Sequence, residues 1–191
     1  MTYLLGGLFL FLIPHSLRIV ADGWRTRMIA RIGLLSWKAG YALVSLAGFA
    51  LIVIGYADAR TSLVLYDPPH FTRYIAGLLM LIALVLVAAA YVPRNHFKTA
   101  LGHPMAAGVK LWAFAHLLSN GRLSDVILFG AFLAWSVMSF IAARRRDRAA
   151  GTVYPQGDEM RTMLTVIAGV GAWAVLVSGL HQVLIGVPPF A

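Results

Sequence analysis

The sequence predicts an all-α, polytopic membrane protein with a bundle of about six transmembrane helices. Hydrophobic residues make up 60% of the 191 positions and charged residues 12%, whereas a soluble domain carries about 25% charged residues. The mean hydropathy is +0.80. No apolar stretch alternates at the period of a β-strand, as a membrane barrel would require. This composition excludes a soluble enzyme, and the absence of cysteine excludes disulfides, thiolate chemistry and haem attached through cysteine.

The apolar stretches predict six helices within one transmembrane domain, residues 1–191. Spanning a bilayer core of about 30 Å takes about 20 apolar residues. The first stretch lacks a basic leading region and a small-residue cleavage site, so we expect a retained helix rather than a signal peptide. The fourth begins at Pro104, contains Lys110 and is closed by Asn120 and Gly121. The predicted helices cover about 3–21, 37–57, 73–92, 104–119, 124–143 and 163–187.

The net charge of +9 is concentrated in alternate connections. The connections 21–36, 93–103 and 144–162 hold most of the lysines and arginines, and the other two hold only Arg60, Arg73 and Arg122. Because lysine and arginine favour the cytoplasmic side, both termini are expected on the non-cytoplasmic side. The basic residues lie between apolar stretches and form no continuous stripe, so the expected partner is the lipid bilayer and not nucleic acid.

Histidine is the chemistry-bearing residue type inside the predicted helices. All seven acidic residues fall in connections or at helix ends, which gives no support to a proton relay or a cation transporter. Four histidines lie within or at the edge of predicted helices: His15, His103, His116 and His181. An ionisable residue within a span indicates a functional site. The alternative is a neutral imidazole hydrogen-bonded to a neighbouring helix.

Depth selects His15 and His116 as a pair. Each lies 12 residues, or about 18 Å, from one membrane edge, His15 from the outer edge and His116 from the inner one. In a core of about 30 Å their levels differ by about 6 Å. His103 is expected at the inner surface and His181 close to the outer one, so these two are the weaker candidates for metal ligands.

The neighbours of the two histidines are polar or aromatic. Pro14 is expected to kink the first helix, and Arg18, Asp22 and Arg25 continue a polar stripe from His15 to the inner surface. On the fourth helix, Trp112 and Asn120 share one face with His116.

Two imidazoles on different helices, without thiolates, predict a haem b held by axial histidines. A zinc ion would need a third or fourth ligand at the same level, and only His103 or His181 could supply it.

The chain resembles the NnrU family, small bacterial inner-membrane proteins linked to the expression of nitrite and nitric oxide reductases. The resemblance rests on Pro14-His15-Ser16-Leu17-Arg18, on His103-Pro104-Met105 and on the block Trp112-Ala113-Phe114-Ala115-His116-Leu117-Leu118-Ser119-Asn120-Gly121. The family is similar in turn to the 15-cis-zeta-carotene isomerases, membrane enzymes with haem b and axial histidines. The resemblance implies that His15 and His116 ligate haem iron, with Arg18, Trp112 and Asn120 beside them. The isomerases carry a cysteine where this chain has Ala113, which removes a ligand-exchange role for that thiol.

Three functions follow from these observations. The first is a haem-dependent isomerase or oxidoreductase acting on a lipid-soluble substrate. The second is a haem protein without turnover, which senses nitric oxide or redox state or assists assembly of the reductases. The third is a membrane methyltransferase with a site near His103, because Gly102-His103-Pro104 faintly resembles the Arg-His-Pro motif of isoprenylcysteine-type enzymes.

Overall fold

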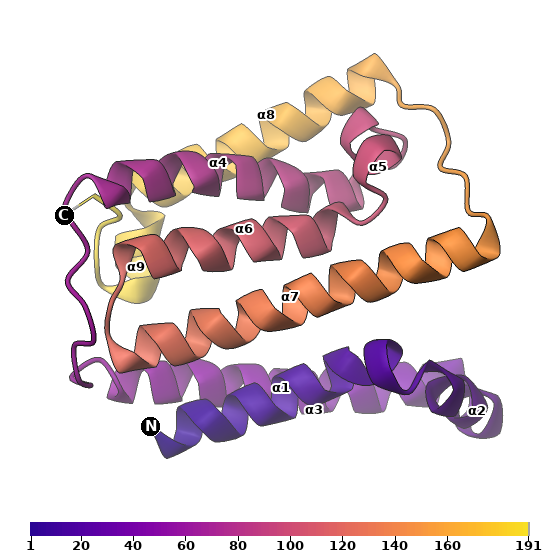
Figure 1. Cartoon of the computed structure of the whole chain (residues 1–191), viewed down its shortest axis with the longest axis horizontal. Helices are drawn as coiled ribbons and strands as arrows, with labels where there is room; N and C mark the ends of the chain where they lie inside the picture. Colours follow the sequence, from indigo (N-terminus) through magenta and orange to yellow (C-terminus); the bar gives the residue numbers. More distant parts are fainter. Residues whose placement is uncertain (191) are drawn as a thin grey trace.

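The computed structural model describes residues 1–190, and helices dominate them (Figure 1). The elements in chain order are α1 (Thr2–Val20), α2 (Asp22–Ile32), α3 (Leu34–Asp58), α4 (Thr72–Tyr91), α5 (His96–Leu101), α6 (Pro104–Ser119), α7 (Leu123–Ala150), α8 (Glu159–Val175), a π-helical turn η1 (Leu176–Leu180) and α9 (His181–Ile185). Within this range the only β-bridge joins Val64 and Arg122. The all-α class predicted from composition is confirmed.

Five segments are long and apolar enough to cross a membrane: α1, α3, α4, α7 and the run Glu159–Ile185. The chain is therefore a multi-pass membrane protein. Helix α6 coincides with the expected segment 104–119 and is shorter, at 16 residues, or about 24 Å. Its buried face consists of Pro104 and small residues, Ala106, Ala107, Gly108, Ala113 and Ala115, which allow its neighbours to approach closely.

Three expectations about the elements were wrong. The expected helix 163–187 is interrupted, because Gly179 takes φ 149°, a conformation that suits glycine and breaks helical hydrogen bonding. The connection 21–36 contains helix α2, which starts after Ala21 leaves the helical region. Helix α7 continues to Ala150, well past residue 143, because its arginine-rich last turns extend beyond the apolar part. Pro14, expected to kink the first helix, lies inside α1, which runs on to Val20.

The long helices form a row in which each packs on its neighbour. The order in space is α3, α1, α7, α6, α4 and α8 (Figure 1). Helix α7 therefore joins two halves, α1 with α3 on one side and α4, α6 and α8 on the other. The two termini lie at the same end of the row (Figure 1).

Glycines bring α1 and α3 into backbone contact. A Cβ at Gly7 would lie 2.5 Å from the backbone nitrogen of Ile52, and one at Gly48 would lie 2.7 Å from that of Phe11. A Cβ at Gly55 would collide with the backbone of Leu4. Such close crossings of small residues are a principal source of helix association in lipid.

The arginine-rich connections meet at one end of the bundle, which we call the basic end. It comprises α2, the start of α3, the segment 92–103, the last turns of α7 and the segment 151–158, and lies opposite the termini (Figure 1). At the other end, residues 59–71 cover the junction of α6 and α7. There the amide of Leu65 donates to the Gly121 carbonyl at 2.8 Å, and the amide of Leu123 donates to the Leu63 carbonyl at 2.8 Å.

Candidate functional site

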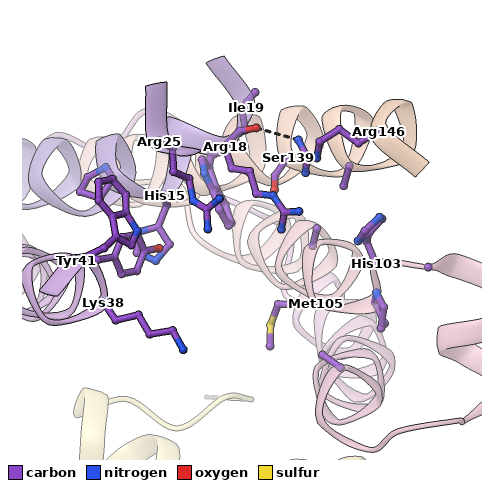
Figure 2. Close-up of a pocket in the computed structure, with 18 of the residues that line it drawn as sticks. His15, Arg18, Ile19, Arg25, Lys38, Tyr41, His103, Met105, Ser139 and Arg146 are labelled. Carbon is purple, nitrogen blue, oxygen red and sulfur yellow. Dashed lines mark hydrogen bonds between the residues drawn. The ribbon is translucent and has the colours of Figure 1, made fainter. Parts of the chain in front are cut away.

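A cavity of about 560 Å³ opens at the basic end, between α1 and α3 on one side and α6 on the other, with α7 behind (Figure 2). Its volume falls in the range of small-molecule sites, about 300–1,000 Å³. Helices α1 and α7, together with Trp37 and Tyr41 of α3, supply an apolar and aromatic wall. Three side chains with possible metal-ligating atoms also line it: His15, His103 and Met105.

His15 is held in one orientation by its own helix. Its Nδ1 lies 2.6 Å from the Phe11 carbonyl oxygen, and its ring stacks on Phe11 with centroids 4.2 Å apart. Tyr41 and Trp135 flank the imidazole at centroid distances of 5.0 and 5.9 Å. When Nδ1–H donates to a carbonyl, Nε2 carries the lone pair that a metal can accept. The structure thus fixes the tautomer that a ligating histidine requires.

Five cationic side chains surround the same cavity: Arg18, Arg25, Lys38, Lys98 and Arg146. Arg146 is anchored, because its Nη1 donates to the Arg18 carbonyl at 2.9 Å (Figure 2). Lys98 donates to the Ala90 carbonyl at 3.2 Å. Of the residues that the structure describes, no aspartate or glutamate lines this cavity. The lining therefore suits a ligand that is apolar in its body and negatively charged at the basic end.

An unpaired donor lies in the cavity wall. The indole Nε1 of Trp135 is buried and has no hydrogen-bond partner within residues 1–190. An unsatisfied buried N–H of this kind is unfavourable by about 1–3 kcal/mol. A ligand with an acceptor atom would satisfy it.

His103 enters a polar cluster at the mouth of the cavity. Its Nε2 lies 2.8 Å from Asp147 Oδ2, and the hydroxyl of Tyr154 donates to the same oxygen at 2.8 Å. Burial and the Asp147 carboxylate raise the pKa of the Tyr154 phenol, so it remains a donor at neutral pH. The cluster ties the start of α6 to α7 and to the segment 151–158, and it occupies Nε2, one of the two ring nitrogens of His103.

His116 lies elsewhere, toward the other end of α6. Its Nδ1 lies 2.9 Å from the Trp112 carbonyl, and its ring stacks on Phe129 at 4.5 Å. It does not line the cavity. On α7, His15 contacts Trp135 and His116 contacts Phe129, which are six residues or about 9 Å apart along the axis. His15 and His116, the pair expected from sequence, are therefore offset from each other along the axis of α7.

Aromatic side chains connect the two histidines. Phe132 lies 5.7 Å from Phe11, which stacks on His15, and 5.5 Å from Trp112, which contacts His116 at 5.2 Å. Phe132 therefore contacts an aromatic neighbour of each imidazole. Trp112 thus belongs to the layer between the two histidines.

Of the other expected site residues, one lines the cavity and the others lie toward the end of the bundle that holds the termini. Arg18 lines the cavity with His15. Asn120 caps α6, since its Nδ2 donates to the His116 carbonyl at 2.9 Å, and it does not touch that imidazole through any hydrogen bond in the described chain. His181, in α9, has its Nδ1 2.6 Å from the Val187 carbonyl.

The sequence reasoning missed most of the cationic lining and two further wall residues. In the sequence, Lys98 and Arg146 indicate topology alone and Lys38 follows the basic connection 21–36. Met105 enters only through the resemblance motif His103-Pro104-Met105, and Trp135 is one residue of an apolar helix. Only Arg18 and Arg25 carried a usable signal, because they continue the face of His15. The others come from separate helices and meet through tertiary packing.

Fold and site together define a multi-pass membrane protein with a polar, histidine-containing cavity at its basic end. The NnrU protein family matches residues 3–189, nearly the whole chain. The protein is a member of the NnrU family. No curated protein and no solved structure matches it.

Proposed function

We propose that this protein binds haem b in the cavity at the basic end, with His15 as an axial ligand. The observation that carries the proposal is the position of His15, whose Nδ1 is held by a backbone carbonyl while its ring lines a 560 Å³ cavity. Bound haem would supply one-electron chemistry and a coordination position for a small molecule. We include a place in bacterial denitrification in the proposal, because the resemblance to the NnrU family implies a link to the expression of nitrite and nitric oxide reductases.

The residues of the cavity fit this group. Haem carries two propionates on a flat apolar ring, and the cavity joins an aromatic wall to five cations. Arg18 and Arg146 are placed to bind a carboxylate, because arginine offers a planar pair of donors to it. The unpaired Nε1 of Trp135 could donate to a propionate or to a ligand on the iron.

Two residues compete for the second axial position. The family resemblance implies His116, which lies outside the cavity lining, beside Trp112 and Phe129. Met105 lies in the same cavity, on the side opposite His15 (Figure 2), and methionine sulfur is an accepted haem ligand. Both arrangements keep His15.

Two functions are compatible with haem in this cavity, one catalytic and one not. A haem isomerase or oxidoreductase would convert a lipid-soluble substrate in the cavity, and a nitric oxide or redox sensor would bind its ligand without product. The methyltransferase alternative is less favoured by the same lining. S-adenosylmethionine carries a positive sulfonium next to its reacting carbon, and the five cations of the lining disfavour it; the nearby Asp147 carboxylate already contacts His103 and Tyr154.

The test is the haem content of purified variants expressed with ample haem. His15→Ala should lower the haem-to-polypeptide ratio at least about tenfold, because loss of even an outer-shell partner of a metal ligand lowers affinity by about 10–100-fold. His70→Ala is the matched control, because His70 lies on the connection between α3 and α4, outside the cavity lining, and its ring interacts with the neighbouring Arg73 and Tyr74. A His15→Ala protein with wild-type haem content would contradict the proposal.

The same series identifies the second ligand. His116→Ala and Met105→Leu are compared by the spin state of the retained haem. The variant whose spectrum changes from low spin to high spin has lost the second ligand. If only Met105→Leu loses the low-spin spectrum, the second ligand lies within the cavity. If only His116→Ala loses it, the second ligand is the one implied by the resemblance.

A further inference from the structure

A second cavity, of about 500 Å³, lies between the ends of α1 and α7 at the basic end. Arg18 and Ile19 come from α1, and Met138, Ile141, Ala142, Arg145 and Arg146 come from α7. Arg18, Ile19 and Arg146 are shared with the first cavity, whereas the remaining four residues line the second cavity alone. We call it the arginine groove.

The arginine groove holds positive charge that the protein does not neutralise. Within residues 1–190, none of its three arginines has a carboxylate within 4.0 Å. Asp147, the acidic residue nearest in sequence to Arg145 and Arg146, contacts His103, Tyr154 and Arg144 instead. Asp22, the nearest to Arg18, lies 3.6 Å from Arg25. Arg146 is bound to a neutral carbonyl instead, that of Arg18. These guanidinium groups are therefore available to a negatively charged partner from outside the chain.

The rest of the groove is apolar and faces outward. Met138 is 51% exposed and Ile141 44% exposed, and both lie on a helix that spans the membrane. From Met138 to Arg145 the groove follows α7 for about 10 Å. An apolar floor that faces lipid and ends at arginines matches an amphiphile with a negative head and an acyl tail.

We infer that the arginine groove binds an anionic phospholipid from the leaflet at the basic end. Its phosphate would lie among Arg18, Arg145 and Arg146, and an acyl chain would follow the apolar floor. Basic recesses between transmembrane helices are suited to acidic lipid headgroups. Arg145 and the floor residues distinguish this site from the proposed haem site, because they are absent from the first cavity, whereas Arg18 and Arg146 line both.

The experiment measures which lipid the purified protein retains. The protein is equilibrated in mixed micelles with equal amounts of phosphatidylglycerol and phosphatidylcholine, washed, and its bound lipid is quantified by mass spectrometry. Wild type should retain phosphatidylglycerol in excess. Arg145→Gln should lower that retention about fivefold, the equivalent of about 1 kcal/mol for one arginine near a lipid headgroup, and Arg145→Lys should largely preserve it.

Arg148→Gln is the matched control, because Arg148 lies on the same helix end and outside the groove. Equal losses in the two glutamine variants would overturn the site in favour of general surface charge, and so would equal retention of the two lipids by wild type. Displacement of the lipid by millimolar glycerol phosphate would overturn the lipid in favour of a soluble phosphate ester. If Arg145→Gln does not fold, Ile141→Gln tests the floor: unchanged retention there contradicts the inference.

Discussion

At the scale of single residues, His15 and His116 are held by the same kind of hydrogen bond to their own helix. In His15 and in His116, Nδ1 bonds the carbonyl four residues earlier, at 2.6 and 2.9 Å. The helix therefore fixes the tautomer and leaves Nε2 directed away from its own backbone. A histidine near the end of an apolar helix can satisfy one nitrogen locally, so the other remains available for a ligand.

Asn95 is the most connected polar residue near the site and makes a direct stability test. Its side chain is fully buried, donates to the carbonyls of Ala89 and Val92 at 2.8 and 2.6 Å, and accepts from the amide of Lys98 at 2.8 Å. It therefore ends α4 and caps α5. Asn95→Ala should lower the free energy of unfolding by about 2 kcal/mol.

The measurement is the thermal unfolding midpoint in detergent, which should fall by about 4–8 °C. Asn95→Ser keeps an acceptor for the Lys98 amide and loses the two donated bonds, so an intermediate midpoint is expected. Equal midpoints for Asn95→Ala and wild type would contradict this role of Asn95.

At the scale of elements, sequence periodicity and composition were sufficient wherever a helix is long and apolar. The starts and ends of α1, α4 and α6 agree with expectation within one residue, because hydrophobicity and proline act locally. The interruptions of helices could not be predicted from hydrophobicity or proline. Glycine at 179 resembles the other glycines of the last helix in sequence, and only its φ of 149° distinguishes it.

The crossing of α1 and α3 gives a prediction with an adjacent control. Gly7→Ala would place a Cβ 2.5 Å from the Ile52 backbone, whereas a Cβ at Gly6 meets nothing within 4 Å. Gly7→Ala should therefore destabilise the protein by about 1–3 kcal/mol, and Gly6→Ala should be neutral or slightly stabilising. The measurement compares the thermal unfolding midpoints of the two variants in one detergent. Equal midpoints would exclude a close α1–α3 contact.

At the scale of the whole molecule, packing determined what the sequence could not. Cations from five helices and turns meet around His15 because α7 holds the two halves of the row together. Residue spacing could place His15 and His116 at similar depths, but it could not show that Phe132 and Trp112 lie between them. The cavity is formed by tertiary packing, whereas one of its lining residues, His15, could be selected as a site candidate from the sequence.

Orientation in the membrane is testable because the chain has no cysteine. If the basic end is cytoplasmic, as the positive-inside rule predicts, Leu63→Cys should react with a membrane-impermeant maleimide in intact cells. Val153→Cys should react only after the membrane is opened. Both positions are exposed, at 68% and 88%. The reverse pattern would place the termini in the cytoplasm.

The central claim is that the cavity at the basic end holds haem b. The most direct measurement is the dithionite-reduced minus oxidised absorption spectrum of the wild-type protein, purified in detergent after expression with ample haem. The account predicts a sharp, low-spin b-type difference spectrum with about one haem per chain, the number that one such cavity can hold. A flat difference spectrum from folded protein would contradict it.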